Sequence, residues 1–435
     1  MNASRTSLPI TAPAEARWRS LAAAALLLAA VGYNFVLAIV NANVFAIGPG
    51  AAYVAEMAIY AGCFVIGMKS LGREGTALLL TGLGLVLGVN LLRFLATWQV
   101  DPKFIRDAII PFAFLALGSA YRGSLLKLVM GLALIVALVA GFEMAAPEAY
   151  GDLVNPRSYF VNTRGAAEED FWNEESKLYV SATRPGERNW LAEMGMARAS
   201  SIFIEPVTMG NFAIFLCAIA VTFRRSLGVA GQVSALLLVV FLLFACDGRL
   251  ATATCALMLL LAPFLRRLDQ TLAFLIFIAV LLAGGLVVWV AGVGAYEDTL
   301  LGRVFFSVDT IVHLSPQSWL GLDFATPYKY FDSGIAYFIA SQSIAVVLAF
   351  LIAYSFLLRM PTSHGQLFKN LFVMAFALSL LVSNGYFSVK TAALWWFACG
   401  YLWQVQALRA GIAGGARTAA VPQAAIGVRH AGGTA

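Results

Sequence analysis

The stretch from Gln270 to Gly294 reads QTLAFLIFIAVLLAGGLVVWVAGVG and holds no charged side chain. One helical crossing of a bilayer needs about 20 mainly apolar residues, so this stretch predicts a transmembrane helix. The rest of the chain has a similar character, because 61% of its 435 residues are apolar and 12% are charged, whereas a soluble domain carries about 25% charged residues. The composition excludes an ordinary soluble enzyme and predicts an all-α polytopic membrane protein.

Apolar runs bounded by charge or by Gly and Pro predict about twelve transmembrane helices. They cover residues 20–41, 51–68, 75–95, 107–121, 125–145, 202–223, 229–246, 250–265, 270–294, 334–357, 367–384 and 391–408. The predicted order is an N-terminal segment 1–19, five helices in 20–145, a large loop 146–201, helices six to nine in 202–294, a second large loop 295–333, helices ten to twelve in 334–408, and a disordered tail 409–435.

The charged residues predict the orientation of these helices. With twelve crossings both termini lie on one side, which carries 16 of the 29 basic residues but only the acids Glu15, Glu74 and Asp269. Those basic residues are Arg5, Arg17, Arg19, Lys69, Arg73, Arg122, Lys127, Arg224, Arg225, Arg266, Arg267, Arg359, Lys369, Arg409, Arg417 and Arg429. Because basic residues concentrate on the cytoplasmic side, both termini are predicted to be cytoplasmic and both large loops to lie on the opposite face. The net charge of +6 therefore reflects topology and does not point to nucleic acid.

Five cysteines are present, and all lie inside predicted spans, so neither large loop can hold a disulfide of its own. They are Cys63, Cys217, Cys246, Cys255 and Cys399. No spacing of Cys and His is typical of a metal site, and we predict neither a metal nor a cofactor.

The end of the first large loop carries a candidate site. Trp190, Leu191 and Met194 have helical spacing, which predicts a short amphipathic helix over residues 187–198, with Arg188 on it. That helix would deliver Arg198 to the start of the sixth span. There Glu205 precedes a proline at a helix entrance, where an acid either interacts with the helix dipole or lines a polar site at the lipid boundary.

Further polar residues stand at helix ends on the same predicted face. Asp247-Gly248-Arg249 forms a turn between the seventh and eighth spans, and Arg303 begins a predicted amphipathic helix that reaches His313. Asp332 precedes the tenth span, where it is predicted to cap the helix. If the spans form a bundle, the arginines and carboxylates converge, a set suited to a phosphate-bearing lipid headgroup and to deprotonation of a hydroxyl.

Taken in order, these motifs resemble those of the Wzy-type polysaccharide polymerases and the O-antigen ligases. The motifs are Arg198 to Gly210, Asp247-Gly248-Arg249, Arg303 to Gly321, and Asp332-Ser333-Gly334-Ile-Ala-Tyr337. The similarity covers roughly residues 195–355 and rests on their order rather than on any single motif. Glu205 stands where many members have Asn, and Asp332 stands where ligases have a His, so polymerases of secreted exopolysaccharides of the xanthan kind are the closer comparison.

The resemblance implies a membrane glycosyltransferase that joins undecaprenyl-diphosphate-linked oligosaccharide repeat units at the periplasmic face, by metal-independent, inverting transfer. It implies that Arg198, Arg249 and Arg303 hold the diphosphate, and that Asp332, or alternatively Glu205, takes the acceptor proton. Arg188, His313 and Tyr337 are candidate sugar contacts. A flippase and a chain-length regulator are the implied protein partners.

Two alternatives remain open at this point. An O-antigen ligase would transfer the glycan to a lipid A core and differs only in the acceptor. A transporter or flippase with twelve helices belongs to another class and would be favoured by composition and topology alone. Carriers built from two similar halves show internal symmetry, whereas here both large loops fall on one predicted face and no half-repeat is visible.

Overall fold

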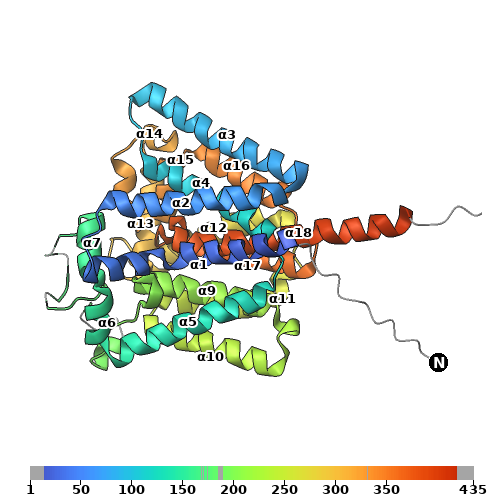
Figure 1. The fold of residues 1–435 in the computed structure, drawn as a ribbon. Helices are drawn as coiled ribbons and strands as arrows, with labels where there is room; N and C mark the ends of the chain where they lie inside the picture. The colour runs from blue at the N-terminus through green and yellow to red at the C-terminus, as the bar shows by residue number, and fades with distance from the viewer. Residues whose placement is uncertain are drawn as a thin grey trace, which may run out of the picture.

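The computed structural model describes residues 14–418 except 168, 170, 174, 185–189 and 331, and within these residues it contains helices and no strand (Figure 1). The long helices are α1 (Ala14–Asn43), α2 (Pro49–Gly67), α3 (Gly72–Thr97), α4 (Pro102–Ala120), α5 (Leu125–Ala145), α9 (Pro206–Thr222), α10 (Gly228–Cys246), α11 (Arg249–Leu265), α12 (Ala273–Ala291), α17 (Ser363–Leu380) and α18 (Val389–Thr418). The shorter ones are α6 (Pro147–Val154), α7 (Pro156–Arg164), α8 (Trp190–Glu193), α13 (Leu300–Val312), α14 (Pro316–Trp319), α15 (Gly334–Gln342) and α16 (Ile344–Ile352).

Six helices are long and apolar enough to cross a membrane, namely α1, α2, α3, α5, α10 and α12, and the bent pair α15–α16 would be a seventh. Each of the twelve predicted ranges coincides with a helix or a pair of helices. Helices α9 and α11 are apolar but have 17 residues each, and α4 carries Lys103, Arg106 and Asp107 in its first two turns. A helical membrane protein is thus confirmed, while twelve crossings stay a prediction.

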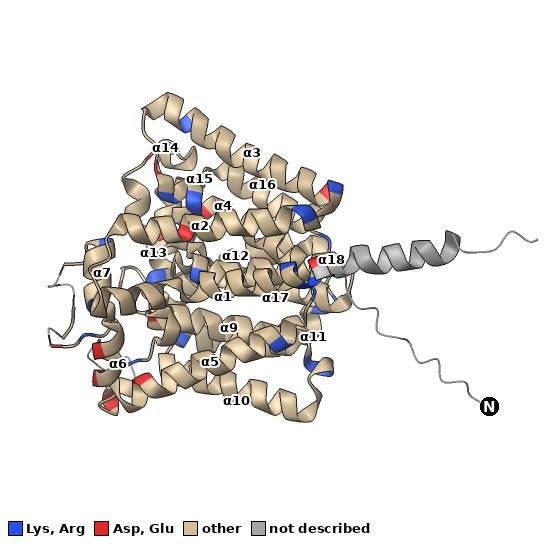
Figure 2. Ribbon diagram, in the orientation of Figure 1, with Lys and Arg blue, Asp and Glu red and all other residues tan. Residues whose placement is uncertain are grey.

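The two ends of the bundle differ in charge (Figure 2). The turns between α2 and α3, α10 and α9, and α11 and α12 lie at one end together with the start of α1, and lysines and arginines gather there. We call this the basic end. Helices α6, α7, α8, α13 and α14 belong to the opposite end, which we call the loop end and where acidic residues are frequent. This separation is the one expected from the sequence, and which end faces the cytoplasm stays a prediction.

The core and the surface divide as they do in a membrane bundle. Helices α9 and α17 are buried almost throughout, and α18 packs along α4. By contrast α12 exposes Leu282, Leu286, Trp289 and Val290. Large contiguous apolar surface is rare on soluble proteins, whereas lipid tails cover it at no cost, so these faces are where the bilayer contacts the protein.

Two glycines let α4 and α18 approach closely. A Cβ atom added to Gly118 would lie 2.0 Å from the Phe397 carbonyl oxygen, and one added to Gly400 would lie 2.0 Å from the Leu115 carbonyl oxygen. Small residues at helix contacts allow such backbone proximity in membrane proteins. Glycine is therefore required on both sides of this contact.

Replacing Gly400 with leucine is expected to lower the free energy of unfolding of the bundle by roughly 1–3 kcal/mol, the usual cost of overpacking a tight contact. The control is Gly131→Leu on α5, because a Cβ at Gly131 meets no atom within 4 Å. The midpoint temperature of thermal unfolding in detergent, followed as loss of monodisperse protein, should fall for Gly400→Leu only. Equal midpoints in the two variants would contradict the tight contact.

Three predicted boundaries are corrected by the structure. The predicted tenth span, 334–357, is two helices that meet at Ser343 with a bend of 105°. Ser343 adopts a positive φ of 75° and its side chain accepts a hydrogen bond from Val346, so the chain ends one helix and caps the next at the same residue. Helix α1 begins at Ala14, inside the segment predicted to precede it, and α18 continues to Thr418, inside the predicted tail.

Candidate functional site

The loop end holds a group of charged side chains around Arg303. Its Nη1 lies 3.2 Å from Asp332 Oδ1, and its Nη2 lies 2.9 Å from Asp298 Oδ1. Asp298 also forms an ion pair with Arg184. The Tyr296 hydroxyl donates a hydrogen bond of 2.7 Å to Asp332 Oδ2. The structure therefore brings together Arg303 and Asp332, which the sequence analysis had placed in one site.

Local sequence explains how Arg303 is held. Thr299 caps α13 by accepting a hydrogen bond from the Gly302 backbone, which places Arg303 in the first turn of the helix. Helix α13 was predicted from its amphipathic spacing, and that prediction is confirmed. The side chain of Arg303 keeps about a third of its surface exposed, at 31%, so it is accessible to a ligand at the loop end.

Asp332 is buried but does not cap α15. Ser333 is the capping residue instead, since its side chain accepts from the backbone N–H of Ala336. The prediction that Asp332 caps this helix was wrong, because its carboxylate turns toward Arg303 and Tyr296. Burial and the hydrogen bond to Asp332 raise the pKa of Tyr296, which keeps that hydroxyl protonated and donating.

Arg198 links the first loop to the turn between α10 and α11. Its Nε donates a hydrogen bond of 2.8 Å to the Cys246 carbonyl, and its backbone N–H donates one of 3.0 Å to the Ala182 carbonyl. Burial lowers the pKa of the Arg198 guanidinium, and the positive charges of Arg184 and Arg303 lower it further. Cys246 and Asp247 have the opposite effect and raise it. The hydrogen bond to Ala182 holds Arg198 beside the segment that carries Arg184, and Arg184 shares Asp298 with Arg303. We call Arg184, Arg198 and Arg303 the arginine cluster.

Arg184 is the member that sequence reasoning missed. It lies in the mixed-charge part of the first loop, where nothing in its spacing distinguishes it from its neighbours. Its guanidinium carbon lies 5.5 Å from the ring centre of Trp172, an exposed aromatic side chain. Only the folding of the loop against the start of α13 reveals that it belongs to the cluster.

Arg249 stands at the edge of this group. It is exposed at the first residue of α11, and its charge acts on the neighbouring Asp247, which also accepts a hydrogen bond from the Leu191 backbone. Burial raises the pKa of Asp247, opposed by that hydrogen bond and by Arg198 and Arg249. Arg198 thus contacts this turn through the Cys246 carbonyl, whereas Arg249 lies on its exposed side.

The predicted amphipathic helix over 187–198 is shorter than expected. Helix α8 extends only from Trp190 to Glu193. Gly195 has a positive φ of 69°, a left-handed conformation that glycine adopts readily and that cannot continue a right-handed helix. Arg188 lies outside the described residues. The serines that follow serve the fold, since Ser200 and Ser201 donate backbone hydrogen bonds of 2.8 and 2.7 Å to Glu143.

Glu205 belongs to a different set of contacts. Its carboxylate lies 2.8 Å from Arg164 Nη1 and 3.0 Å from Lys390 Nζ, and it accepts a hydrogen bond of 2.7 Å from Thr208. Lys390 is almost fully buried, with 1% of its side chain exposed. Glu205 therefore joins α7, α9 and α18, and none of these three partners belongs to the arginine cluster.

Replacing Glu205 with alanine is expected to cost roughly 3–5 kcal/mol of stability, because it leaves the buried ammonium of Lys390 unpaired. The matched control is Glu175→Ala, at an exposed acid of the first loop. The double variant Glu205→Ala/Lys390→Met should regain most of the loss, since it removes both buried charges. Thermal unfolding of the purified variants measures this, and a single variant as stable as wild type would refute the structural role.

Two other candidates lie away from the arginine cluster. His313 follows the last residue of α13, and its ring contacts the Asp309 carbonyl at 2.9 Å. Because it is ten residues after Arg303, it lies about 15 Å farther along the helix axis. Tyr337 is buried and donates a hydrogen bond of 2.6 Å to Asp107 Oδ2, while Lys103 Nζ donates 2.5 Å to the Tyr337 hydroxyl. The structure does not bring either side chain to Arg303.

Asp107 is part of a second charged group that sequence reasoning missed. Arg106 pairs with Asp107 at 2.7 Å and with Glu56 at 3.5 Å, and the hydroxyl of Tyr60 hydrogen-bonds Glu56. Glu56 lies in the loop-end half of α2, and Arg106 and Asp107 lie in the loop-end half of α4. Buried ionisable groups at membrane depth are costly and are often functional. Their spacing along the sequence gave no signal, because the partners come from different helices.

Among the described residues, no group of three His, Cys, Asp or Glu side chains could hold a metal ion. No protein-family model, no curated protein and no solved structure matches the chain. Fold and site together define an α-helical membrane protein with an arginine-rich charged group at its loop end.

Proposed function

We propose that the protein polymerises undecaprenyl-diphosphate-linked oligosaccharide repeat units into a bacterial exopolysaccharide at the periplasmic face of the inner membrane. The observation that carries the proposal is the arginine cluster at the loop end, in which Arg303 pairs directly with the carboxylate of Asp332. A glycosyl transfer from a lipid diphosphate needs both chemistries, cations for the leaving group and a base for the acceptor hydroxyl.

The arginine cluster supports binding of the diphosphate. Guanidinium groups match phosphate oxygens in a bidentate way and stay charged at any working pH. Arg198 is held by backbone carbonyls, and Arg303 is held by two carboxylates. In this proposal these preorganised donors stabilise the charge that develops on the leaving diphosphate, with Arg249 near the edge of the site.

The ion pair between Arg303 and Asp332 supports a coupled role. When a diphosphate binds Arg303, it competes with the carboxylate for the guanidinium, which frees Asp332 Oδ1 for the acceptor hydroxyl. The acceptor oxygen then forms the new bond to the anomeric carbon, the bond to the diphosphate oxygen breaks, and Asp332 takes the hydroxyl proton. Glu205 is the weaker candidate base, because Arg164, Lys390 and Thr208 all engage its carboxylate.

Orientation and partners follow from the same proposal. The basic end faces the cytoplasm by the positive-inside rule, so the arginine cluster faces the periplasm, where flipped lipid-linked units are found. A flippase would supply those units, and a chain-length regulator would act on the product. An O-antigen ligase with the same donor is the alternative that differs only in acceptor.

A transporter or flippase is the alternative from another class, and two observations favour it. The broken pair α15–α16 is a feature of transporters whose interrupted helices line a midplane site, and the charged group around Asp107 is buried between helices. Neither feature needs a catalysed reaction to explain it, so both fit a protein that only moves its substrate.

The decisive experiment incubates the purified protein, reconstituted in liposomes, with lipid-linked repeat units as the only substrate. A polymerase makes a ladder of longer lipid-linked chains, which gel electrophoresis resolves. A transporter leaves every chain at one unit, and a ligase extends chains only when a lipid A core acceptor is added. Absence of a ladder from folded, monodisperse protein would overturn the proposal.

A further inference from the structure

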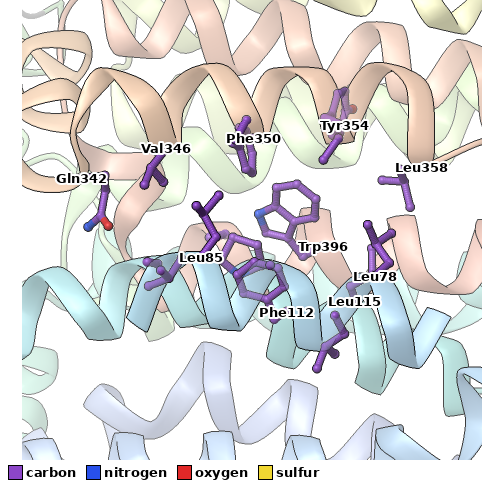
Figure 3. A pocket seen from close by; sticks show the side chains of 18 of the residues that line it. Leu78, Leu85, Phe112, Leu115, Gln342, Val346, Phe350, Tyr354, Leu358 and Trp396 are labelled. Carbon is purple, nitrogen blue, oxygen red and sulfur yellow. The ribbon is translucent and has the colours of Figure 1, made fainter. Parts of the chain in front are cut away.

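An elongated apolar cavity of about 430 Å³ lies between α3, α4, α16 and α18 (Figure 3). This size falls within the range of ligand pockets, about 300–1,000 Å³. On α16 and the turn after it the lining extends from Val346 to Leu358, which corresponds to about 18 Å at 1.5 Å per residue. Figure 3 shows Gln342 near one end and Leu78 and Leu358 near the other. The cavity is therefore long, narrow and parallel to the helices.

The cavity reaches the lipid-facing surface. Leu85 on α3 and Ile352 and Leu357 on the opposite wall line it, and these side chains are 41%, 56% and 55% exposed. The inner wall is aromatic, with Phe112 and Trp396 pointing into the space in Figure 3. An alkyl chain in the bilayer could enter sideways without crossing a polar barrier.

A buried cation stands beyond the loop end of this cavity. Arg93 follows Val86, a lining residue of α3, by two helical turns and lies on the same face of the helix. Only 2% of Arg93 is exposed. Its Nη2 donates 2.7 Å to the carbonyl of Ser341, the residue before Gln342, whereas Nε and Nη1 are buried with no hydrogen-bond partner among the described residues.

The unpaired N–H groups of Arg93 point to an anionic ligand. No carboxylate of the described residues lies within ion-pair distance of Arg93, and its neighbours are the rings of Phe104 and Phe324. A buried cation without a partner is costly. The N-terminus of α16 lies close by, since a Cβ on Gly321 would be 2.5 Å from Arg93 Nη2 and 3.0 Å from the Ser343 nitrogen. Such a terminus attracts phosphate.

The acids at this end are already engaged. Asp107 lines the cavity but pairs with Arg106 and accepts from Tyr337. Asp101 accepts hydrogen bonds from Tyr328 and from the Lys103 backbone. Lys103 is engaged as well, since its Nζ lies 3.8 Å from Asp107 Oδ2 and donates a hydrogen bond to the Tyr337 hydroxyl. Arg93 is thus the charged side chain that keeps unpaired N–H groups among the described residues at this end.

We propose that this cavity is a binding site for a single-chain polyprenyl phosphate, with the isoprenoid chain between α3 and α16 and the phosphate at Arg93 and the N-terminus of α16. The choice of a polyprenyl lipid rests on the proposed function, because a polymerase handles two lipid-linked units and the arginine cluster accounts for one. A narrow cavity of about 430 Å³ accommodates one chain, which disfavours a phospholipid with two.

The test is photo-crosslinking of the purified full-length protein with a polyprenyl monophosphate that carries a diazirine in its chain, followed by mapping of labelled peptides. Label is expected on α3, α4, α16 and α18, which line the cavity, and unlabelled polyprenyl phosphate should suppress it. Polyprenol without phosphate, and phosphatidic acid with two chains, should each need at least tenfold higher concentration. Inorganic phosphate alone should not suppress it.

Variants separate the chain site from the phosphate site. Ala349→Trp fills the cavity and should reduce labelling at least fivefold, whereas Ala256→Trp on the exposed face of α11 should not. Leu85→Trp, at the exposed rim, repeats the test if Ala349→Trp is not monodisperse. Arg93→Gln should make polyprenol compete as well as polyprenyl phosphate, whereas Arg225→Gln at the basic end should not.

Labelling confined to helices other than α3, α4, α16 and α18, labelling unaffected by the Trp variants, or equal competition by phosphatidic acid would each overturn the site. The liposome polymerisation assay keeps the two proposals apart. A ladder without label in the cavity removes this site and leaves the polymerase, whereas specific label without any ladder removes the polymerase and leaves the lipid site.

Discussion

Replacing Arg303 with alanine is expected to lower polymer formation at least 100-fold while the protein stays folded. Loss of one preorganised donor to a developing anion costs about 10²–10³ in rate, and Arg303 also positions Asp332 through their 3.2 Å ion pair. Arg303→Lys should recover only part of the activity, because an ammonium cannot bind a phosphate and a carboxylate in the bidentate geometry of guanidinium.

The measurement is the initial rate of chain extension in liposomes, with lipid-linked repeat units as substrate. Lys177→Ala is the matched control, since Lys177 is an exposed cation of the first loop that pairs with Asp152. Arg198→Ala should resemble Arg303→Ala, and exposed Arg249→Ala should show a smaller loss. Wild-type rates in both Arg198→Ala and Arg303→Ala would remove the arginine cluster from the reaction.

Replacing Asp332 with asparagine is expected to have the second large effect, a loss of about 10²–10⁴ in the rate of transfer, the usual contribution of a general base. Asparagine keeps the shape and can still accept from Tyr296, so binding of the lipid-linked donor should change less than turnover. The rate at saturating substrate should therefore fall while the substrate concentration at half-maximal rate stays within about threefold.

A structural role for Asp332 would give a different pattern. If the carboxylate only orients Arg303, then Tyr296→Phe, which removes the other hydrogen bond to Asp332, should impair transfer as much as Asp332→Asn. Undiminished transfer by Asp332→Asn would eliminate it as base and return attention to Glu205.

Much of the fold was predictable because it depends on local composition. Apolar length located every long helix, and the amphipathic spacing from Arg303 to His313 predicted α13. The break at Ser343 was not predictable, because the chain carries no proline or glycine there, and a serine adopts a positive φ only when the surrounding helices hold it. Helix α8 was overestimated because a hydrophobic pattern cannot show where Gly195 turns the chain.

The candidate site was predictable only in part. Arg303 and Asp332 stand at helix ends on one face, so topology alone suggested that they meet. Arg184 could not be identified, because one arginine in a charged loop resembles another. Glu205 and Tyr337 looked like site residues, yet each makes its ion pair or hydrogen bonds with residues from other helices.

The sequence by itself determined that this is a helical membrane protein whose charges divide between two ends, because apolar length and charge placement act residue by residue. The tertiary structure alone decided which charges meet. An ion pair such as Glu205 with Lys390 joins residues 185 positions apart, and Arg93 reaches Ser341 across 248. No local pattern records such contacts, since they depend on how helices pack. Within the described part of the chain, the same packing leaves Arg93 without a carboxylate in ion-pair distance beside an apolar cavity, which composition could not reveal.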